Sequence, residues 1–171
     1  MDAFSSHLDP ETAISWEGQA WRHLSPGFDP LSTRGAELHG GRWNPPGSSA
    51  LYLATTPDVA RAEFDRLVSL RAQAAADLHP RVLVTVEAEI GLVADLTDPA
   101  VLADLGVRPA GQDEMPIQAC RSCGVRAAEA GLGALLAPSA TGQGDVLVVF
   151  PGNLADSDRL MVVGSRSVDW T

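Results

Sequence analysis

A cation, an aromatic ring and a carboxylate follow one another in the first half of this 171-residue chain. Arg42 lies in the run GGRWNPPG at positions 40–47, Tyr52 follows ten positions later, and Glu63 eleven positions after that. An arginine can grip an anion through two parallel hydrogen bonds, and an aromatic ring can stack on a heterocycle. A carboxylate can stabilise the positive charge that develops when a glycosidic bond breaks. The three side chains in this order suit the cleavage of a glycosidic bond in a dinucleotide.

The composition limits the other chemistry that the chain can perform. All twelve basic residues are arginine, which excludes a lysine nucleophile, a Schiff base and a Gly-Lys-Ser/Thr phosphate loop. The net charge of −10 argues against general binding to nucleic acid or to anionic membranes, and no apolar run approaches the ~20 residues of a membrane span. Because the N-terminus lacks a signal-peptide pattern, we expect a cytoplasmic protein.

Two cysteines, Cys120 and Cys123, form a lone CxxC pair within a predicted amphipathic helix. A zinc site would need two more ligands at suitable spacing, and the four histidines are scattered upstream. We therefore expect reduced structural thiols and no bound metal, with a redox or metal role as the alternative. His23 and His39 lie near key arginines, and we expect both to be structural or exposed.

The elements that must position these residues are many strands and few helices. Strands are predicted over 16–24, 50–54, 81–90 (continuing over 93–96), 134–138, 145–150 and 159–163, with a further short strand beginning at Arg42. Helices are predicted over 56–76, 99–105 and 117–130. The other segments are predicted as a loose leader over 1–13, a long loop over 25–41 and a turn over 112–116. Strands and helices do not alternate regularly and no GxGxxG follows the first strand, so we expect one α+β domain over 1–171 with mixed or antiparallel sheets, not a Rossmann fold.

The helix that carries Glu63 has a clear beginning. Thr56 is a good N-cap, Pro57 suits the first helical position, and Asp58 places an acid in the first turn. Apolar residues then recur at three- and four-residue steps, which puts Glu63 on or beside the buried face. A carboxylate in that position is unusual unless it is paired or lines a cavity.

Each of these residues also has a purely structural interpretation. Arg42 could be a surface salt-bridge partner, and Tyr52 a half-buried core residue. Glu63 could pair with Arg66, three positions on in the same helix. A later candidate, Ser139 in the Ala-Pro-Ser-Ala segment at 137–140, could be a plain turn residue. Their joint order along the chain favours the functional interpretation.

Further motifs extend the pattern in both directions. Trp-Arg at positions 21–22 precedes the GGRWNPPG run, and Ala-Pro-Ser-Ala at 137–140 precedes a VLVVFP strand. Together with Leu-Tyr-Leu at 51–53 and the glutamate, these motifs resemble the RES domain family of bacterial toxins, from about residue 16 to 153. The family's functional residues map onto Arg22, Arg42, Tyr52, Glu63 and Ser139.

The resemblance implies an ADP-ribosyltransferase-like fold, NAD as the substrate and no separate cofactor. Family members break the nicotinamide–ribose bond with water or inorganic phosphate as the acceptor. By this resemblance, Arg22 and Arg42 would bind the pyrophosphate, Tyr52 would stack on nicotinamide, and Glu63 would stabilise the ribose cation. Ser139 would hydrogen-bond nicotinamide, ribose or the incoming phosphate.

The resemblance also implies a partner. This is a cognate antitoxin, usually a small helix-turn-helix protein that contacts DNA itself, within a complex that contains a toxin homodimer. Two other functions stay open: an ADP-ribosyltransferase that modifies a host protein, and a non-catalytic domain that binds NAD within a complex. The residues leave the acceptor open between water, phosphate and a protein side chain.

Overall fold

The computed structural model describes residues 6–107 and 116–171, and within them six strands form one mixed sheet. The strand order is β1-β2-β5-β4-β3-β6, and an additional pairing of β1 with β3 closes five of the strands into a barrel. The strands are β1 (Ile14–Leu24), β2 (Leu51–Ala54), β3 (Arg81–Asp95), β4 (Ala134–Pro138), β5 (Asp145–Val149) and β6 (Arg159–Val168). The expected α+β class is confirmed.

Four α-helices and three short 3-10 helices complete the described chain. The α-helices are α2 (Arg34–His39), α3 (Pro57–Arg71), α4 (Pro99–Asp104) and α5 (Ile117–Glu129), and the 3-10 helices are η1 (Pro10–Thr12), η2 (Ala75–Leu78) and η3 (Pro151–Asn153). No helix in the described part of the chain is long and apolar enough to cross a membrane.

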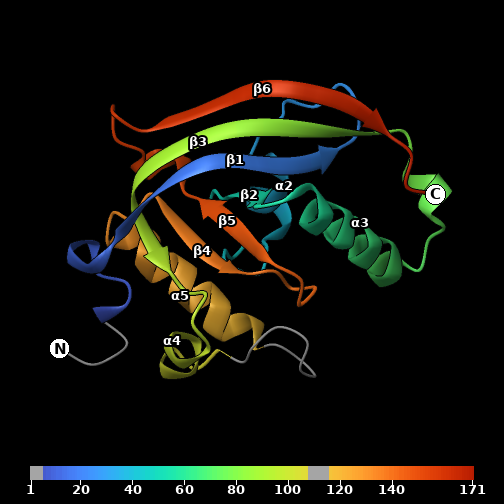
Figure 1. Ribbon diagram of the computed structural model, residues 1–171. Coiled ribbons are helices and arrows are strands. Elements are labelled where there is room, and N and C mark those ends of the chain that lie inside the picture. Colours follow the sequence, from blue (N-terminus) through green and yellow to red (C-terminus); the bar gives the residue numbers. More distant parts are fainter. Residues whose placement is uncertain (1–5, 108–115) are drawn as a thin grey trace.

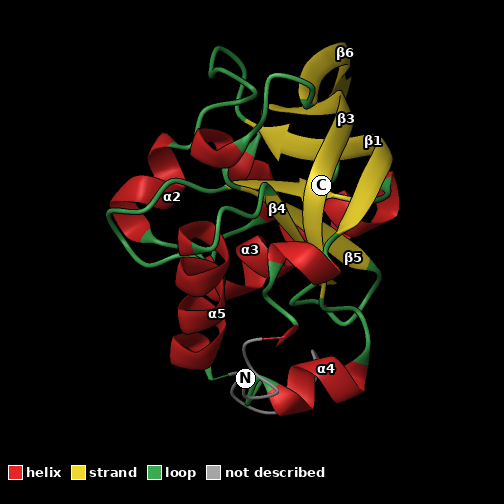
Figure 2. Ribbon diagram, turned by 90° about the vertical axis from the view of Figure 1, so that its left-hand side faces the viewer, coloured by secondary structure: helices red, strands yellow, loops and turns green. Residues whose placement is uncertain are grey.

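The long strands β1, β3 and β6 lie side by side above the shorter β2, β4 and β5 (Figure 1). β1 and β3 pair antiparallel from Trp16↔Ile90 to Leu24↔Val82, while β3 and β4 form the parallel pair of the sheet. One core cluster joins Ala20, Val86 and other residues of the barrel strands, and a second packs the barrel against the helices. The 90° view shows α2 and α5 on the same side of the strands (Figure 2).

Helix α3 begins as the sequence predicts and ends earlier. The hydroxyl of Thr56 accepts a hydrogen bond from the Val59 amide at 3.2 Å, and Pro57 fills the first helical position. The helix stops at Arg71 because Ala72 adopts a left-handed conformation, with φ 50° and ψ 36°. The predicted extension to residue 76 is therefore wrong, and the short helix η2 follows instead.

The segment between β1 and β2 differs most from the sequence prediction. The predicted loop over 25–41 contains helix α2, whose end is marked by Gly40 with φ +69°. The strand predicted from Arg42 is absent from the described residues, because the chain there bends around the fully buried side chain of Trp43.

Differences elsewhere concern mainly the ends of elements. The predicted leader includes Leu8, which is only 4% exposed and belongs to the core, whereas residues 1–5 lie outside the described residues. β3 runs unbroken through Gly91, and β6 continues to Val168. The turn predicted over 112–116 lies almost wholly outside the described residues.

Helix α5 packs directly against the backbone of the GGRWNPPG run. A Cβ atom added at Gly124 of α5 would lie 1.6 Å from the carbonyl oxygen of Trp43. Only glycine permits this approach, since no side-chain atom fits in that space. The contact fixes the distance between α5 and the segment that carries Arg42.

We expect Gly124→Ala to lower the free energy of unfolding by about 2 kcal/mol or more, because overpacking forces the helix away from Trp43. Denaturant unfolding followed by tryptophan fluorescence measures this effect. The matched control is Gly152→Ala in η3, where an added Cβ meets no atom within 4 Å. Equal stability of the two variants would contradict the tight contact.

Candidate active site

A cavity of about 450 Å³ opens between β1, α2, β2 and α3 and the end of β4. This size is typical of a small-molecule site. Among the described residues that line it, the charged side chains at neutral pH are three arginines and one carboxylate: Arg22, Arg42, Arg66 and Glu63. The cavity is therefore locally positive in a protein whose net charge is −10, and it suits an anionic ligand.

The hydroxyl of Tyr52 organises the turn that carries Arg42. It donates to Oδ1 of Asn44 at 2.7 Å and accepts from the amide of Trp43 at 2.9 Å. Asn44 is 1% exposed, and its Nδ2 donates to the carbonyls of Ala36 and Ser48 at 3.0 and 2.9 Å. Burial raises the pKa of Tyr52, so the hydroxyl keeps its proton and this bonding pattern. The aromatic ring lines the cavity.

The two glycines before Arg42 are required by close contacts. A Cβ atom at Gly41 would lie 2.4 Å from the Tyr52 hydroxyl, and one at Gly40 would lie 2.9 Å from Nη2 of Arg121. Arg121, on α5, also donates from Nε to the Gly41 carbonyl at 3.0 Å. The turn is thus held from β2 on one side and from α5 on the other.

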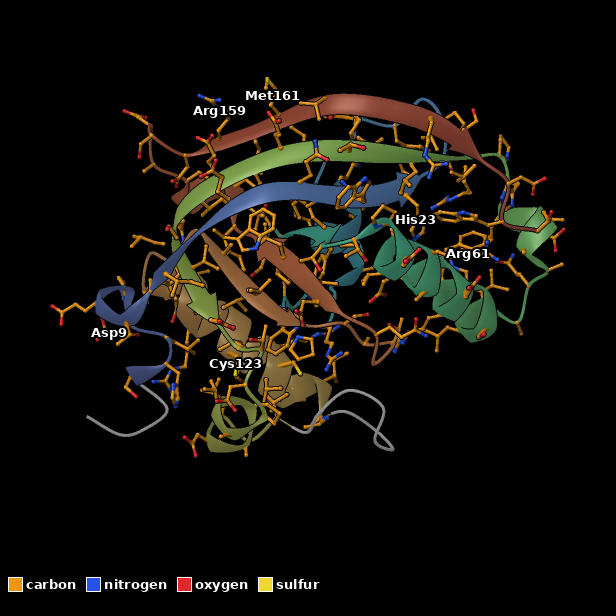
Figure 3. All side chains as sticks on the ribbon, viewed as in Figure 1. Asp9, His23, Arg61, Cys123, Arg159 and Met161 are labelled. Atoms are coloured by element: carbon orange, nitrogen blue, oxygen red, sulfur yellow. The ribbon has the colours of Figure 1, made fainter. Side chains whose placement is uncertain are left out.

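Arg42 reaches the cavity from this turn. Its guanidinium lies 5.6 Å from the centre of the Trp43 ring and hydrogen-bonds the Cys120 thiol, an interaction that opposes the rise in the pKa of Cys120 caused by burial. Cys120 and Cys123 are free and buried, and Cys123 lies on α5 (Figure 3). This arrangement agrees with the expected structural role of the thiols.

Glu63 is held by Ser139, which lies at the end of β4. The Ser139 hydroxyl donates to Oε1 of Glu63 at 2.5 Å and accepts from the amide of Thr141 at 3.1 Å. Ser139 is fully buried, and its neighbours Pro138 and Ala140 line the cavity in its place. Its hydroxyl fixes the carboxylate, and the expected contact of Ser139 with a ligand stays a prediction.

The alternative pairing of Glu63 with Arg66 is not formed. The ion pairs among the described residues join His7 to Asp104, Arg61 to Asp65, and Arg159 to Glu89. Arg66 is exposed on α3 and lines the cavity one turn beyond the carboxylate. The helix therefore presents a carboxylate and a cation that do not neutralise one another.

Arg22 lines the cavity and also holds the loop that follows β1. Its Nη1 donates to the carbonyls of Pro30 and Ser32, both at 2.8 Å. Burial lowers its pKa and the nearby carboxylate of Asp29 raises it. Arg22 therefore lies at the cavity as predicted, and its Nη1 is bound to the loop that follows β1.

His23 is a cavity residue that serves structure. Its Nδ1 accepts a hydrogen bond from Nη2 of Arg81 at 2.7 Å, and its ring packs edge-on against Phe64 and Trp170 at 5.6 and 5.7 Å. Burial, together with the charges of Arg81 and Arg22, lowers the pKa of His23 to about 3. The neutral ring lies between the end of β1 and α3 (Figure 3) and supports the helix that bears Glu63.

The sequence interpretation missed Arg66 and Arg121. Arg66 had a usable signal. Residues three apart on a helix share a face, so the helix that places Glu63 in the cavity places Arg66 there too. Arg121 had none, because no local pattern shows which turn of α5 meets the Gly41 carbonyl. The cavity nevertheless brings together Arg22, Arg42, Tyr52 and Glu63, with Ser139 directly behind the carboxylate.

The chain resembles known proteins over most of its length. The RES domain model matches residues 19–171. The chain is 29% identical to the "NAD(+) phosphorylase MbcT" of Mycobacterium bovis and to that of Mycobacterium tuberculosis, in each case over 159 residues that cover 86% of this chain and 83% of the relative. The crystal structure of the M. tuberculosis MbcT–MbcA toxin–antitoxin complex matches with a TM-score of 0.84 and 25% identity, covering 99% of this chain and 94% of that one.

We expect Tyr52→Phe to lower the free energy of unfolding by about 1–3 kcal/mol, because Asn44 and the Trp43 amide would lose a buried partner. Denaturant titration measures the loss. Ser69→Ala is the control: it removes a hydroxyl that donates to a carbonyl at an exposed position of α3, where an effect within about 0.5 kcal/mol is expected. A Tyr52→Phe protein as stable as this control would refute the anchoring role.

The depressed pKa of His23 predicts a pH dependence of stability. Below pH ~6.5 the unfolded chain protonates this histidine and the folded protein does not, so stability falls as the pH drops toward 3. We expect His23→Asn to reduce the slope of unfolding free energy against pH by about 1 kcal/mol per pH unit over this range. The control measurement is the NMR titration of His23, and a midpoint near 6.5 would contradict the prediction.

Proposed function

The chain belongs to the RES domain family, and on this premise we propose that it cleaves the nicotinamide–ribose bond of NAD as the toxin of a toxin–antitoxin pair. The observation that carries the proposal is Glu63, held at 2.5 Å by Ser139 in a cavity with three arginines. One fixed carboxylate beside several cations matches a substrate with a cationic ribose-nicotinamide end and an anionic pyrophosphate. The MbcT relatives are named NAD(+) phosphorylase, which supports the same substrate.

Glu63 is the group that acts on the reacting bond. Nicotinamide leaves with the electron pair of the N-glycosidic bond, and its positive charge is neutralised as it departs, so no general acid is needed. Positive charge develops on the ribose in the transition state, where a preorganised carboxylate stabilises it. Ser139 is a positioning residue in this scheme, because its hydroxyl holds the carboxylate in one orientation.

The arginines and the tyrosine place the substrate. Arg42, and the part of the Arg22 guanidinium not committed to the loop, would bind the pyrophosphate. Tyr52 would contribute its ring to the nicotinamide pocket, since its hydroxyl is committed to Asn44 and Trp43. No separate cofactor takes part in this reaction.

We propose inorganic phosphate as the acceptor. An oxygen of the phosphate would attack C1′ of the ribose as nicotinamide leaves, giving ADP-ribose 1″-phosphate and nicotinamide. The excess of arginine over carboxylate in the cavity favours an anionic acceptor over water. Transfer to a protein and binding without turnover are the alternatives that the experiment below separates.

The proposal extends to the fold lineage and the partner. We place the mixed-sheet architecture with the ADP-ribosyltransferase-like folds. The likeness to MbcT in the MbcT–MbcA complex supports a cognate antitoxin, which we propose to be a small helix-turn-helix protein that binds DNA on behalf of a complex containing a toxin homodimer.

We expect purified protein to release nicotinamide from NAD faster as phosphate is added, and Glu63→Gln to reduce release by about 100-fold or more, the loss typical of removing a preorganised transition-state contact. Chromatography of nicotinamide and of ADP-ribose 1″-phosphate measures both. Arg42→Ala should raise the KM for NAD.

The matched control is Glu87→Gln, an exposed glutamate of β3 that does not line the cavity, which should act as wild type. Absence of nicotinamide release at every phosphate concentration would overturn the proposed activity. Labelled NAD that marks a discrete protein in lysate would favour transfer to protein over phosphorolysis.

A further inference from the structure

Helix α3 presents an ordered series of side chains to the cavity. Ala60, Glu63, Arg66, Leu67 and Leu70 all line it and recur at the three- and four-residue steps of one helix face. At its two ends Ala60 is 2% exposed and Leu70 is 67% exposed, and Glu63 is half-buried. The series therefore runs from the interior of the cavity to its mouth.

The chemical character of the series changes in the same direction. A carboxylate comes first, a guanidinium follows one turn on, and two leucines come last. Arg66 takes part in none of the ion pairs among the described residues, so its charge is available to a ligand. Leu70 is a large apolar side chain that lines the cavity but is left mostly in water, where an apolar face of a ligand would cover it.

The dinucleotide has the same order. From the reacting ribose outward it carries a pyrophosphate, a second ribose and then adenine, which has a wide apolar face. At 1.5 Å per residue, the seven positions from Glu63 to Leu70 span about 10 Å along the helix, comparable to the reach of a pyrophosphate and one ribose. With the ribose at Glu63, the adenosine end of an extended NAD comes to the last turns of α3.

The lining contributed by α2 leaves room for such a ring. It consists of Gly35 and Ala36, and a Cβ atom added at Gly35 would meet no atom within 4 Å. No α2 side chain larger than the methyl group of Ala36 therefore lines the cavity.

We propose that Leu67 and Leu70 form the adenosine-binding platform of the site, with Arg66 contacting the pyrophosphate on its inner side. This assignment rests on the proposed NAD-cleaving function and deepens it, because it identifies the residues that select a dinucleotide over a mononucleotide. Covering an exposed leucine with an adenine face removes apolar area from water, and this stabilises the bound state.

The test measures equilibrium binding, which does not depend on turnover. In the Glu63→Gln background, calorimetry would compare NAD with nicotinamide mononucleotide, which lacks adenosine. We expect Leu70→Asp to weaken NAD binding by about fivefold to tenfold and to leave mononucleotide binding unchanged. The matched control is Leu92→Asp on β3, an exposed leucine that does not line the cavity, which should change neither affinity.

Unchanged NAD affinity in the Leu70→Asp protein, an equal loss for both nucleotides, or no binding of NAD would each overturn the platform. Nicotinamide release by the wild-type protein tests the proposed reaction separately. If NAD binding depends on Leu70 but NAD is never cleaved, the adenosine-binding platform is supported and the proposed reaction is refuted.

Discussion

The hydroxyl of Tyr52 is the point on which the site's geometry depends. It joins β2, a strand inside the barrel, to the turn of Arg42 through one donated and one accepted hydrogen bond. The donated bond to Asn44 requires the neutral phenol, and burial secures that state by raising its pKa. Gly41 leaves space for the hydroxyl, and α5 then closes over the turn through Arg121.

A second, independent interaction holds the negatively charged side chain of the cavity, Glu63. Glu63 comes from α3 and Ser139 from the end of β4, and their hydrogen bond crosses 76 positions of the chain. The carboxylate is thus held by different elements from Arg22 and Arg42, so that it does not need to pair with either of them. Keeping unlike charges apart costs electrostatic energy, and a bound ligand that carries both charges recovers it. The net charge of −10 meanwhile disfavours large polyanions, which leaves the cavity to small ones.

Local patterns in the sequence predicted what local physics decides. Alternating valines specified β3, and the Thr56 cap specified the start of α3, because these signals act within a few residues. Helix α2 was missed because six residues with a glycine in the second position carry too little periodicity. The strand expected from Arg42 does not form, because the hydrogen bonds of Trp43 and Asn44 with the Tyr52 hydroxyl shape that turn. The same limit explains the site: the residue types around the cavity were predictable, whereas the burial of Ser139 behind Glu63 depends on how β4 meets α3.

The burial of Ser139 also bears on which group can accept the ribose. Its hydroxyl donates to Glu63 and accepts from the Thr141 amide, and the Thr141 hydroxyl lies 2.7 Å away. A hydroxyl committed in this way, with no exposed surface, cannot approach a ribose in the cavity without releasing the carboxylate. Nucleophilic attack by Ser139 would therefore release the carboxylate that we propose to stabilise the transition state. In the proposed reaction the acceptor enters from solvent, and the arginines at the cavity wall favour an anion in that role.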